Sequence, residues 1–270
     1  MYKKDIIGLL AQVKQKGPLV HHITNYVTVN DCANIVLALG GSPVMADDKN
    51  EVEEMAAVAS SLVLNIGTLT TKTIEAMILA GRKANESDIP VILDPVGIGA
   101  TRLRTKTARE IIREVKISVI RGNLSEIKVL SGLATTTKGV DSVDHDLQGG
   151  REIAGNLARK LNCTVAITGA RDVISDGKRV AFIENGHQMM ARVTGTGCMA
   201  TSLIGVYSGV ASDPFLAAVA GLVTMGLAGE KAYRDLGAQD GVGTFRLRLF
   251  DHVYLLTAND IIEGAKLNGE

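Results

Sequence analysis

The 270-residue chain contains no tryptophan, only 3% aromatic residues and only three cysteines, Cys32, Cys163 and Cys198. Three cysteines with no C-x-x-C spacing predict neither a disulfide framework nor a zinc site, and they favour a cytoplasmic protein. So few aromatic side chains argue against a surface on which the bases of single-stranded nucleic acid would stack. The 29 basic and 29 acidic residues balance, so no net charge draws the chain to nucleic acid or to a membrane. We expect its partner to be a small molecule.

The sequence also lacks an uninterrupted apolar run of membrane-spanning length. Its longest apolar region, from about Phe215 to Ala228, contains glycines and is bounded by Asp213 and Glu230. That length predicts a buried helix rather than a membrane span. Residues 1–17 combine lysines with a short apolar stretch that polar residues interrupt, so they predict an amphipathic helix and not a signal peptide.

What the chain does have is a regular alternation of short apolar runs with longer segments of helical periodicity. This alternation predicts a mostly parallel sheet covered by helices. The predicted parallel strands are 19–24, 61–67, 90–97, 117–123 and 163–169.

One region departs from the parallel pattern. Residues 165–168 are followed closely by a second short apolar run, 172–175. The tight-turn pair Asp176-Gly177 then precedes a third run, 179–183. This spacing predicts a hairpin that adds antiparallel strands to the edge of the sheet.

The remainder of the chain fits around a single sheet. A loop is expected from about Thr135 to Gly150, and the chain is expected to be almost wholly helical after Gly197, with breaks near 212–214 and 237–243. No repeat or linker divides the sequence. We therefore expect one α/β domain over residues 1–270, with a helical C-terminal part.

Polar residues follow several of the predicted strands. In open parallel sheets, ligands bind beyond the carboxyl ends of the strands, so these residues carry the functional information. They are Thr24-Asn25, Asn65-Ile66-Gly67-Thr68, Asp94-Pro95-Val96-Gly97, Arg121-Gly122-Asn123 with Ser125-Glu126, and Thr168-Gly169.

The segment Gly195-Thr196-Gly197-Cys198 leads from a predicted strand into an apolar helix. Glycine permits unusual dihedral angles and close approach of a ligand, while a helix start offers unpaired N–H groups and the positive end of the helix dipole. Such a turn suits the negative charge that builds on a phosphoryl group during transfer. Taken alone, the pattern is more typical of an ordinary glycine-rich helix start, and only its context favours a phosphoryl site.

The thiol of Cys198 stands in the first turn of that helix. We expect the helix dipole to lower its pKa, so that the thiolate acts as a base towards an alcohol. The alternative is a buried structural cysteine, which is the interpretation that we favour for Cys32 and Cys163.

Two carboxylates, Asp94 and Glu126, stand at strand ends where a magnesium-nucleotide would bind. Magnesium takes oxygen ligands and keeps several waters, so we expect both residues to act through its hydration shell. The alternatives are helix capping by Asp94 and compensation of the helix dipole by Glu126.

Five further residues are weaker candidates. Arg121 ends an otherwise apolar strand, and its planar guanidinium suits phosphate oxygens, with a surface ion pair as the alternative. Thr168 ends another strand. We expect His21 and His22 to be structural, and Met45 to be either core or an apolar wall for a ring.

Five motifs in order closely resemble the hydroxyethylthiazole kinase family, over a region from about His21 to the C-terminus. Cysteine after G-T-G, where most ribokinase-like enzymes have aspartate, makes the resemblance specific. The motifs are Asn25, Asn65-Ile66-Gly67-Thr68, 94–101 (D-P-V-G-I-G-A-T), 121–127 (R-G-N-L-S-E-I) and 195–198 (G-T-G-C).

The resemblance implies a ribokinase-like fold and an ATP- and magnesium-dependent kinase. Its expected substrate is the hydroxyethyl alcohol of 4-methyl-5-(2-hydroxyethyl)thiazole, and its product is the thiazole phosphate used in thiamine salvage. It also implies a homotrimer with active sites between subunits, so Met45 is expected to come from a different chain than the Cys198 that it faces.

The resemblance also implies roles for individual residues. Arg121 and Thr168 look like nucleotide contacts, and Met45 and Gly195 look like thiazole contacts. The same pocket is expected to include Asn25, Gly67 and Val27, the metal and phosphates are expected to meet Asp94 and Glu126, and the catalytic turn is expected to be Gly195, Thr196, Gly197 and Cys198.

Two residues depart from the family pattern. Ile98 stands where a small residue is more common, and Leu124 stands where alanine is common. Since both flank the motifs, we expect them to change packing around Asp94 and Arg121 without removing chemistry.

Two alternative functions stay open on sequence grounds. One is another enzyme of the same fold: a pyrimidine or sugar kinase, or an ATP-dependent dehydratase of hydrated nicotinamide nucleotides. Met45, Val27 and Gly67 favour an apolar ring over a sugar. The other is a non-catalytic thiazole- or nucleotide-binding regulator, against which the joint presence of Asp94, Glu126 and Cys198 argues.

Overall fold

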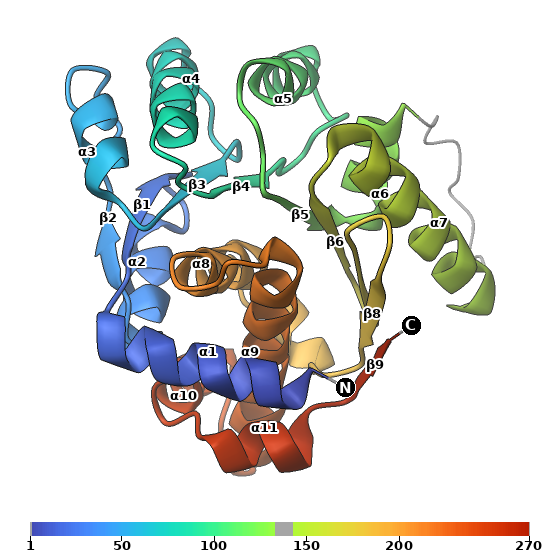
Figure 1. Ribbon diagram of the computed structural model, residues 1–270. Coiled ribbons are helices and arrows are strands. Elements are labelled where there is room, and N and C mark those ends of the chain that lie inside the picture. Colours follow the sequence, from blue (N-terminus) through green and yellow to red (C-terminus); the bar gives the residue numbers. More distant parts are fainter. Residues whose placement is uncertain (1, 133–142, 270) are drawn as a thin grey trace.

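The computed structural model describes residues 2–132 and 143–269. Within these ranges, nine strands form one sheet in the order β2-β1-β3-β4-β5-β6-β7-β8-β9 (Figure 1). The pairs from β2 to β6 are parallel and the last three pairs are antiparallel. The predicted mostly parallel sheet with antiparallel edge strands is therefore confirmed. The strands are β1 (Leu19–Ile23), β2 (Ser42–Val44), β3 (Ser61–Asn65), β4 (Val91–Asp94), β5 (Val119–Asn123), β6 (Thr164–Thr168), β7 (Asp172–Ser175), β8 (Val180–Ile183) and β9 (Leu267–Gly269).

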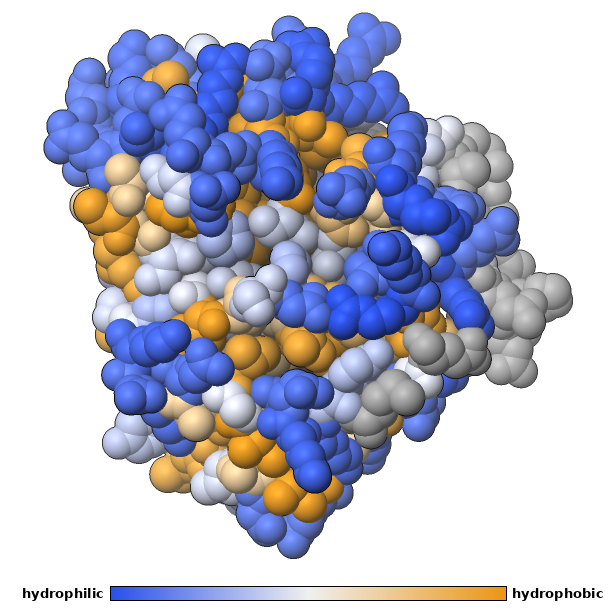
Figure 2. All heavy atoms as spheres, in the orientation of Figure 1, coloured by the Kyte–Doolittle hydropathy of each residue, from blue (hydrophilic) through white to orange (hydrophobic). Residues whose placement is uncertain are grey.

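Helices cover both faces of this sheet, which curves around α8 and α9 (Figure 1). On the inner face, α8 and α9 pack against the strands, and α1, α2, α10 and α11 pack around these two helices, while α3 to α7 cover the outer face. Figure 2 shows hydrophilic side chains over α4 and α5, with hydrophobic surface between these helices. The helices are α1 (Lys3–Lys16), α2 (Val29–Leu39), α3 (Val52–Val58), α4 (Thr71–Glu86), α5 (Arg102–Glu114), α6 (Leu124–Ser131), α7 (Val143–Leu161), α8 (Thr196–Ser208), α9 (Pro214–Arg234), α10 (Val242–Tyr254) and α11 (Ala258–Gly264).

The strands are mostly apolar because both faces of the sheet are buried. In β4, Ile92 belongs to the core on the α8 face, whereas Val91 and Leu93 belong to the core on the outer face. Successive side chains of a strand point to opposite faces, so each face needs its own apolar residues. This arrangement leaves the strand ends as the places where polar side chains can gather.

Helix α9 runs through the centre of the inner layer. It is the one helix in the described part of the chain that is long and apolar enough to cross a membrane, yet 83% of its most apolar stretch is buried inside the protein. Its glycines allow close packing: a side chain at Gly221 would come within 2.8 Å of the Ile204 backbone nitrogen of α8. The prediction of a buried helix at 215–228 is confirmed.

Four local predictions were incomplete or wrong. Strands β2 and β9 were missed because each has only three residues, and β2 contains a proline that only an edge strand tolerates. A 3-10 helix, Gln188–Arg192, precedes the turn at Gly195 in place of the expected strand. The expected loop at 135–150 is wrong from Val143 onward, where α7 begins; residues 135–142 lie outside the described residues.

Candidate active site

The carboxyl ends of the parallel strands meet the N-terminus of α8. Gly195 is the N-cap residue of this helix, with a φ of 84°. A side chain there would lie 2.6 Å from Thr28 Cγ2, so both the backbone angle and the close packing require glycine. The amides of Thr196, Gly197 and Cys198 occupy the first helical turn, where N–H groups have no partner within the helix. The predicted turn therefore forms, at the end of the sheet where ligands are expected.

Two asparagine side chains hold the sulfur of Cys198. The Nδ2 atoms of Asn25 and Asn65 donate to Cys198 Sγ at 3.4 Å and 3.2 Å. The backbone N–H groups of Thr28 and Gly67 donate to the Oδ1 atoms of Asn25 and Asn65 respectively. Because an N–H donor must face an oxygen, these bonds fix both amides with their NH₂ groups towards the sulfur.

The expected lowering of the Cys198 pKa is wrong. Burial raises the pKa of this thiol, and the nearby negative charge of Asp94 raises it further. Hydrogen bonds from Thr28, Asn65 and Asn25 oppose this change but do not reverse it. Desolvation therefore outweighs these hydrogen bonds, and the group is a protonated thiol near neutral pH.

Asp94 ends β4 and is fully buried. Its Oδ2 accepts hydrogen bonds from Thr201 Oγ1 at 2.8 Å and from Asn65 Nδ2 at 3.1 Å, and it lies 3.7 Å from Arg121 Nη1. Burial raises the pKa of this carboxyl to about 6, with the Arg121 charge as the main opposing effect. Its Oδ1 is buried with no partner among the described residues. An unpaired carboxylate oxygen in this place is available for a ligand.

Glu126 shapes the site from the first turn of α6. Its Oε2 accepts the backbone N–H of Asn123 at 2.8 Å, which completes a capping box, and its Oε1 accepts the N–H of Gly97 at 2.8 Å. Glu126 therefore caps α6, which goes beyond the compensation of the helix dipole that was considered as its alternative role. The same carboxylate also ties the loop after β4 to the loop after β5.

The two carboxylates differ in how well they fit a water-mediated magnesium site. Among the described residues, no group of three or more His, Cys, Asp or Glu side chains could hold a metal ion by itself. Magnesium bound with a nucleotide needs only one or two carboxylates beside phosphates and waters. Asp94 offers its unpaired Oδ1, whereas both oxygens of Glu126 already accept backbone N–H groups.

A cavity of about 620 Å³ opens beside the turn. Arg121, Thr168 and Gly197 are among the residues that line it, and Met190 and Met225 supply apolar lining. Arg121 Nη2 donates to Thr168 Oγ1, and its guanidinium lies so close to Gly197 that a side chain there would come within 2.6 Å of Nη1. The two predicted nucleotide contacts therefore lie together in a cavity that could hold a nucleotide.

The predicted substrate residues are only partly brought together. Asn25 and Gly67 lie beside Cys198, with Gly67 so tightly placed that a side chain would meet Asn25 Cβ at 3.0 Å. Val27 is 56% exposed on the loop after β1. Met45 follows β2 at the edge of the sheet and is not among the residues that line the nucleotide cavity.

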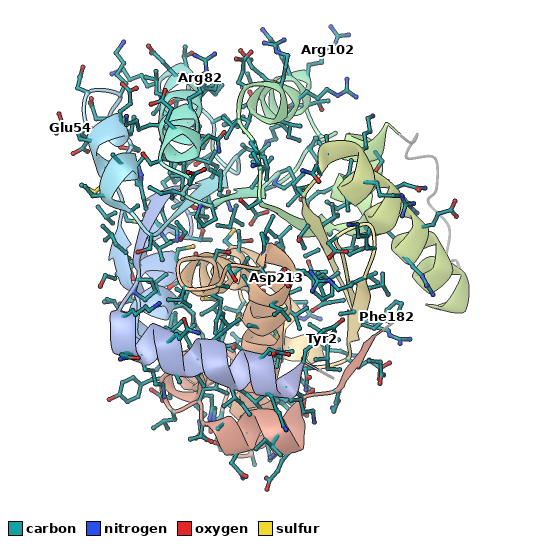
Figure 3. The ribbon with its side chains drawn as sticks, in the orientation of Figure 1. Tyr2, Glu54, Arg82, Arg102, Phe182 and Asp213 are labelled. Atoms are coloured by element: carbon teal, nitrogen blue, oxygen red, sulfur yellow. The ribbon has the colours of Figure 1, made fainter. Side chains whose placement is uncertain are left out.

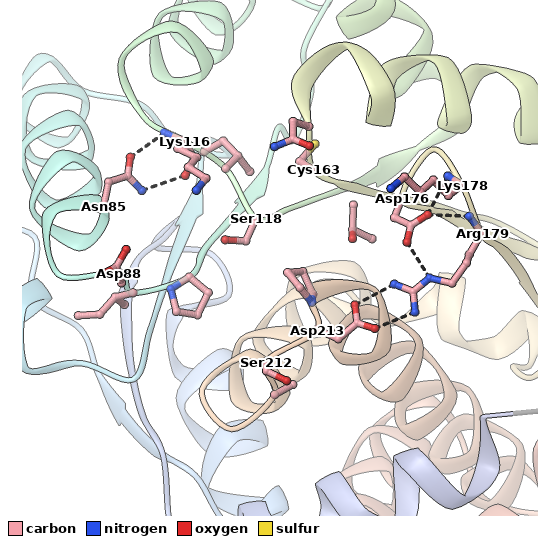
Figure 4. A pocket seen from close by; sticks show the side chains of 17 residues that line it. Asn85, Asp88, Lys116, Ser118, Cys163, Asp176, Lys178, Arg179, Ser212 and Asp213 are labelled. Atoms are coloured by element: carbon pink, nitrogen blue, oxygen red, sulfur yellow. Dashed lines mark hydrogen bonds and ion pairs between the residues drawn. The ribbon is translucent and has the colours of Figure 1, made fainter.

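Another cavity, of about 580 Å³, lies at the opposite, amino-terminal ends of β4, β5 and β6 (Figure 4). Three of its charged side chains bind one another: Arg179 pairs with Asp176 and with Asp213. Asn85 makes two hydrogen bonds with the backbone of Lys116. Since these polar groups are already paired and the turn at Gly195 lies at the other end of the sheet, we assign no function to this cavity.

Some central residues escaped prediction. Asn65 was recognised as a strand-end residue but not as a site residue, although it contacts both Cys198 and Asp94. Thr201 lies one helical turn after Gly197, a spacing that could have placed it on the same face as the turn. His21 and His22 are buried and hydrogen-bonded to Ala46 and Ser202, as a structural role requires.

The fold and the site define a kinase of the ribokinase-like class. The structure matches that of a pyridoxal kinase from Staphylococcus aureus in complex with AMP-PCP, with a TM-score of 0.60 at 17% identity over 78% of this chain and 87% of the other, which shows the shared fold. It matches a hydroxyethylthiazole kinase protein from Pyrococcus horikoshii OT3 much more closely, with a TM-score of 0.90 at 42% identity over 99% of both chains.

The sequence comparisons agree. The model of the hydroxyethylthiazole kinase family matches residues 10–259. The hydroxyethylthiazole kinase of Alkaliphilus oremlandii is 56% identical over 266 residues, which cover 98% of each chain. The chain belongs to the hydroxyethylthiazole kinase family.

Proposed function

We propose that this chain transfers the terminal phosphoryl group of ATP to the hydroxyethyl alcohol of 4-methyl-5-(2-hydroxyethyl)thiazole, giving the thiazole phosphate for thiamine salvage. Family membership supports the reaction. The observation that carries it is the Cys198 thiol, held by Asn25 and Asn65 at the start of α8 and next to the nucleotide cavity. We place the alcohol there, between the sulfur and a nucleotide phosphate.

The proposed mechanism depends on positioning. The alcohol lies between Cys198 and the γ-phosphate, and the amides of residues 195–198 stabilise the charge on the transferring group. Arg121 and Thr168 bind the nucleotide phosphates. Magnesium, held through water by Asp94 and Glu126, would neutralise phosphate charge.

The thiol acts mainly as an orienting group. Burial keeps Cys198 protonated, and the alcohol loses its proton late in a loose transition state, so a strong base contributes little. The sulfur instead fixes the position of the hydroxyl, and the two asparagine amides fix the sulfur.

We infer further that the active enzyme is a homotrimer in which the thiazole pocket forms between subunits. Support comes from exposed apolar side chains near the pocket and on α2 and α10, where water contact is unfavourable. They are Tyr26, Val27, Leu37, Val242, Leu247 and Tyr254. Met45, at the sheet edge, would then complete the pocket of a neighbouring subunit.

Co-expression of two variants tests the shared pocket. A trimer made only of Met45→Ala chains, or only of Cys198→Ala chains, has a damaged residue in every site. In a mixed trimer, a site is intact where a Cys198→Ala chain supplies Met45 and a Met45→Ala chain supplies Cys198. In a head-to-tail ring about a quarter of the sites recover. No recovery of activity in mixed trimers would show that Met45 and Cys198 act within one chain.

Residues 1–270 are proposed to act as one kinase domain, supported by a single sheet that continues from β2 to β9. We place the enzyme in the cytoplasm, where its three free cysteines, Cys32, Cys163 and Cys198, would stay reduced.

The activity is tested by incubating the protein with magnesium-ATP and a panel of thiazole, pyrimidine and sugar alcohols, then measuring ADP. We expect ADP release to depend on the thiazole alcohol. ADP release with a sugar or pyrimidine alone would assign a different kinase, and thiazole binding without turnover would indicate a regulator.

A further inference from the structure

Arg104, in the first turn of α5, joins two loops of the active site. Its Nη1 donates to the carbonyl of Val96 at 2.8 Å, and its Nη2 donates to the carbonyl of Gly67 at 2.7 Å. Val96 lies in the loop after β4, and Gly67 lies in the loop after β3. The structure shows no acidic partner for Arg104 among the described residues, so the guanidinium serves these two carbonyls.

Each carbonyl leads directly to a group of the proposed site. On one side, the N–H of Gly67 donates to Asn65 Oδ1, and the same amide donates through Nδ2 to Cys198 and to Asp94. Two residues, Gly67 and Asn65, therefore connect Arg104 to the sulfur that orients the alcohol.

On the other side, Val96 precedes Gly97, whose N–H donates to Glu126 Oε1 at 2.8 Å. The loop after β4 is thus held from one side by Glu126 and from the other by Arg104. Fixing this loop also fixes the backbone directly after Asp94.

The neighbourhood is shaped to admit a guanidinium. Gly97 has a φ of +71°, and a side chain at this position would lie 2.4 Å from Arg104 Nη1. The hydroxyl of Thr101, the N-cap residue of α5, accepts the N–H of Arg104 and so fixes the start of the helix. A planar fork with several donors can reach two carbonyls at once, whereas an ammonium is a single point of charge.

We propose that Arg104 is a positioning residue for phosphoryl transfer, which ties the loop that shapes the alcohol pocket to the loop that directly follows the metal-side carboxylate of Asp94. The inference rests on the site and activity proposed above. Without this tie the two loops move independently, and the hydroxyl and the phosphate lose their alignment. Misplacement of reacting groups by a fraction of an ångström lowers the rate of the chemical step.

The experiment compares Arg104→Ala and Arg104→Lys with Arg102→Ala in the full-length protein. Arg102 lies on the same helix, with its side chain exposed on the outer surface, and serves as the matched control (Figure 3). For each variant, kcat, KM for the thiazole alcohol, the nucleotide Kd and the thermal unfolding midpoint are measured.

We expect Arg104→Ala to lower kcat by about 10- to 100-fold and to raise KM for the alcohol, with nucleotide Kd changed by less than about twofold. Nucleotide binding is spared because Arg121 and Thr168 stand on β5 and β6, whereas Arg104 holds the loops after β3 and β4. Arg104→Lys should recover only part of kcat, and guanidinium ion added at millimolar concentration should partly restore Arg104→Ala. Arg102→Ala should match the unaltered protein.

Three results would overturn the inference. The first is an unchanged kcat and alcohol KM in Arg104→Ala. The second is a loss of kcat and nucleotide binding in Arg104→Ala that is fully explained by a smaller fraction of folded protein. The third is full activity in Arg104→Lys. An unaltered protein with no thiazole-dependent activity would instead refute the proposed function, so the two failures can be told apart.

Discussion

Replacing Asp94 by asparagine should make the protein more stable and almost inactive. The carboxylate is fully buried, and burial raises its pKa from the ordinary value of 3.8 to about 6. Asparagine resembles the protonated form: its oxygen can accept from Thr201 and Asn65, and its NH₂ group takes the place of the unpaired Oδ1. The substitution therefore removes a buried charge without breaking the two hydrogen bonds.

The size of the effect follows from the pKa. A rise from 3.8 to about 6 is roughly a hundredfold change in proton affinity, which corresponds to about 3 kcal/mol of unfolding free energy above pH 7. The new NH₂ group is itself unpaired and costs about 1 kcal/mol. A net gain of about 2 kcal/mol remains, which raises the unfolding midpoint by roughly 4–8 °C for a chain of this size.

The stability difference between Asp94→Asn and the unaltered protein should depend on pH. Because the folded pKa lies above the unfolded one, the ionised carboxyl destabilises the fold above pH 6, and this cost disappears as the pH falls to 3.8. The gap between Asp94→Asn and the unaltered protein should therefore shrink by about two-thirds from pH 8 to pH 5. Asp48→Asn is the control, since the Asp48 pKa is lowered by Asn50 and the carboxyl is exposed.

The assay is thermal unfolding at fixed protein concentration, without nucleotide and with chelator, beside a measurement of ADP release. We expect kcat of Asp94→Asn to fall by about 10²-fold or more, because the neutral side chain cannot support the metal and phosphates. A variant that is less stable at pH 8, or a stability gap that does not change with pH, would refute the assignment of a destabilising buried charge to Asp94.

Substitutions at three other positions test the turn and its surroundings. Cys198→Ala should lower kcat on the order of 10²-fold. Cys198→Asp should stay active or improve, since Asn25 and Asn65 already offer donors to this position. A folded but inactive Cys198→Asp variant would contradict the orienting role. Gly195→Ala should lower the unfolding midpoint and activity together, because its side chain would lie 2.6 Å from Thr28 Cγ2; unchanged values would mean that the turn adapts. Glu126→Gln should destabilise the fold by about 1–2 kcal/mol in denaturant unfolding, since its NH₂ group must face the N–H of Gly97 or of Asn123; a neutral result would show that the loop rearranges.

Much of the fold follows from the sequence because hydrophobic periodicity is local. The five parallel strands and the hairpin around Asp176-Gly177 were predicted correctly, since each has a continuous apolar run and a turn residue. Strand β2 was missed because three residues carry too little pattern. The start of α7 was missed because polar residues and two glycines hide its apolar face, which becomes regular only from Ile153 onward.

The site was predictable only as far as position along the strands allowed. Asp94, Arg121 and Thr168 could be placed at one edge of the sheet because parallel strands share their carboxyl ends. What the sequence could not show was the protonation state of each group. The pKa of Cys198 depends on its burial next to Asp94, which comes from α8 packing against β4 and not from the first turn of α8 alone.

The asparagines explain how a neutral cysteine can stand at position 198, where an aspartate would also find donors. Asn25 and Asn65 direct two N–H groups at the sulfur, and a carboxylate at that position would receive the same donors. A second carboxylate would also lie close to buried Asp94, where like charges raise each other's pKa. A protonated thiol avoids that repulsion and still orients a hydroxyl. The choice of residue 198 therefore balances general-base strength against the electrostatic cost of a second buried charge.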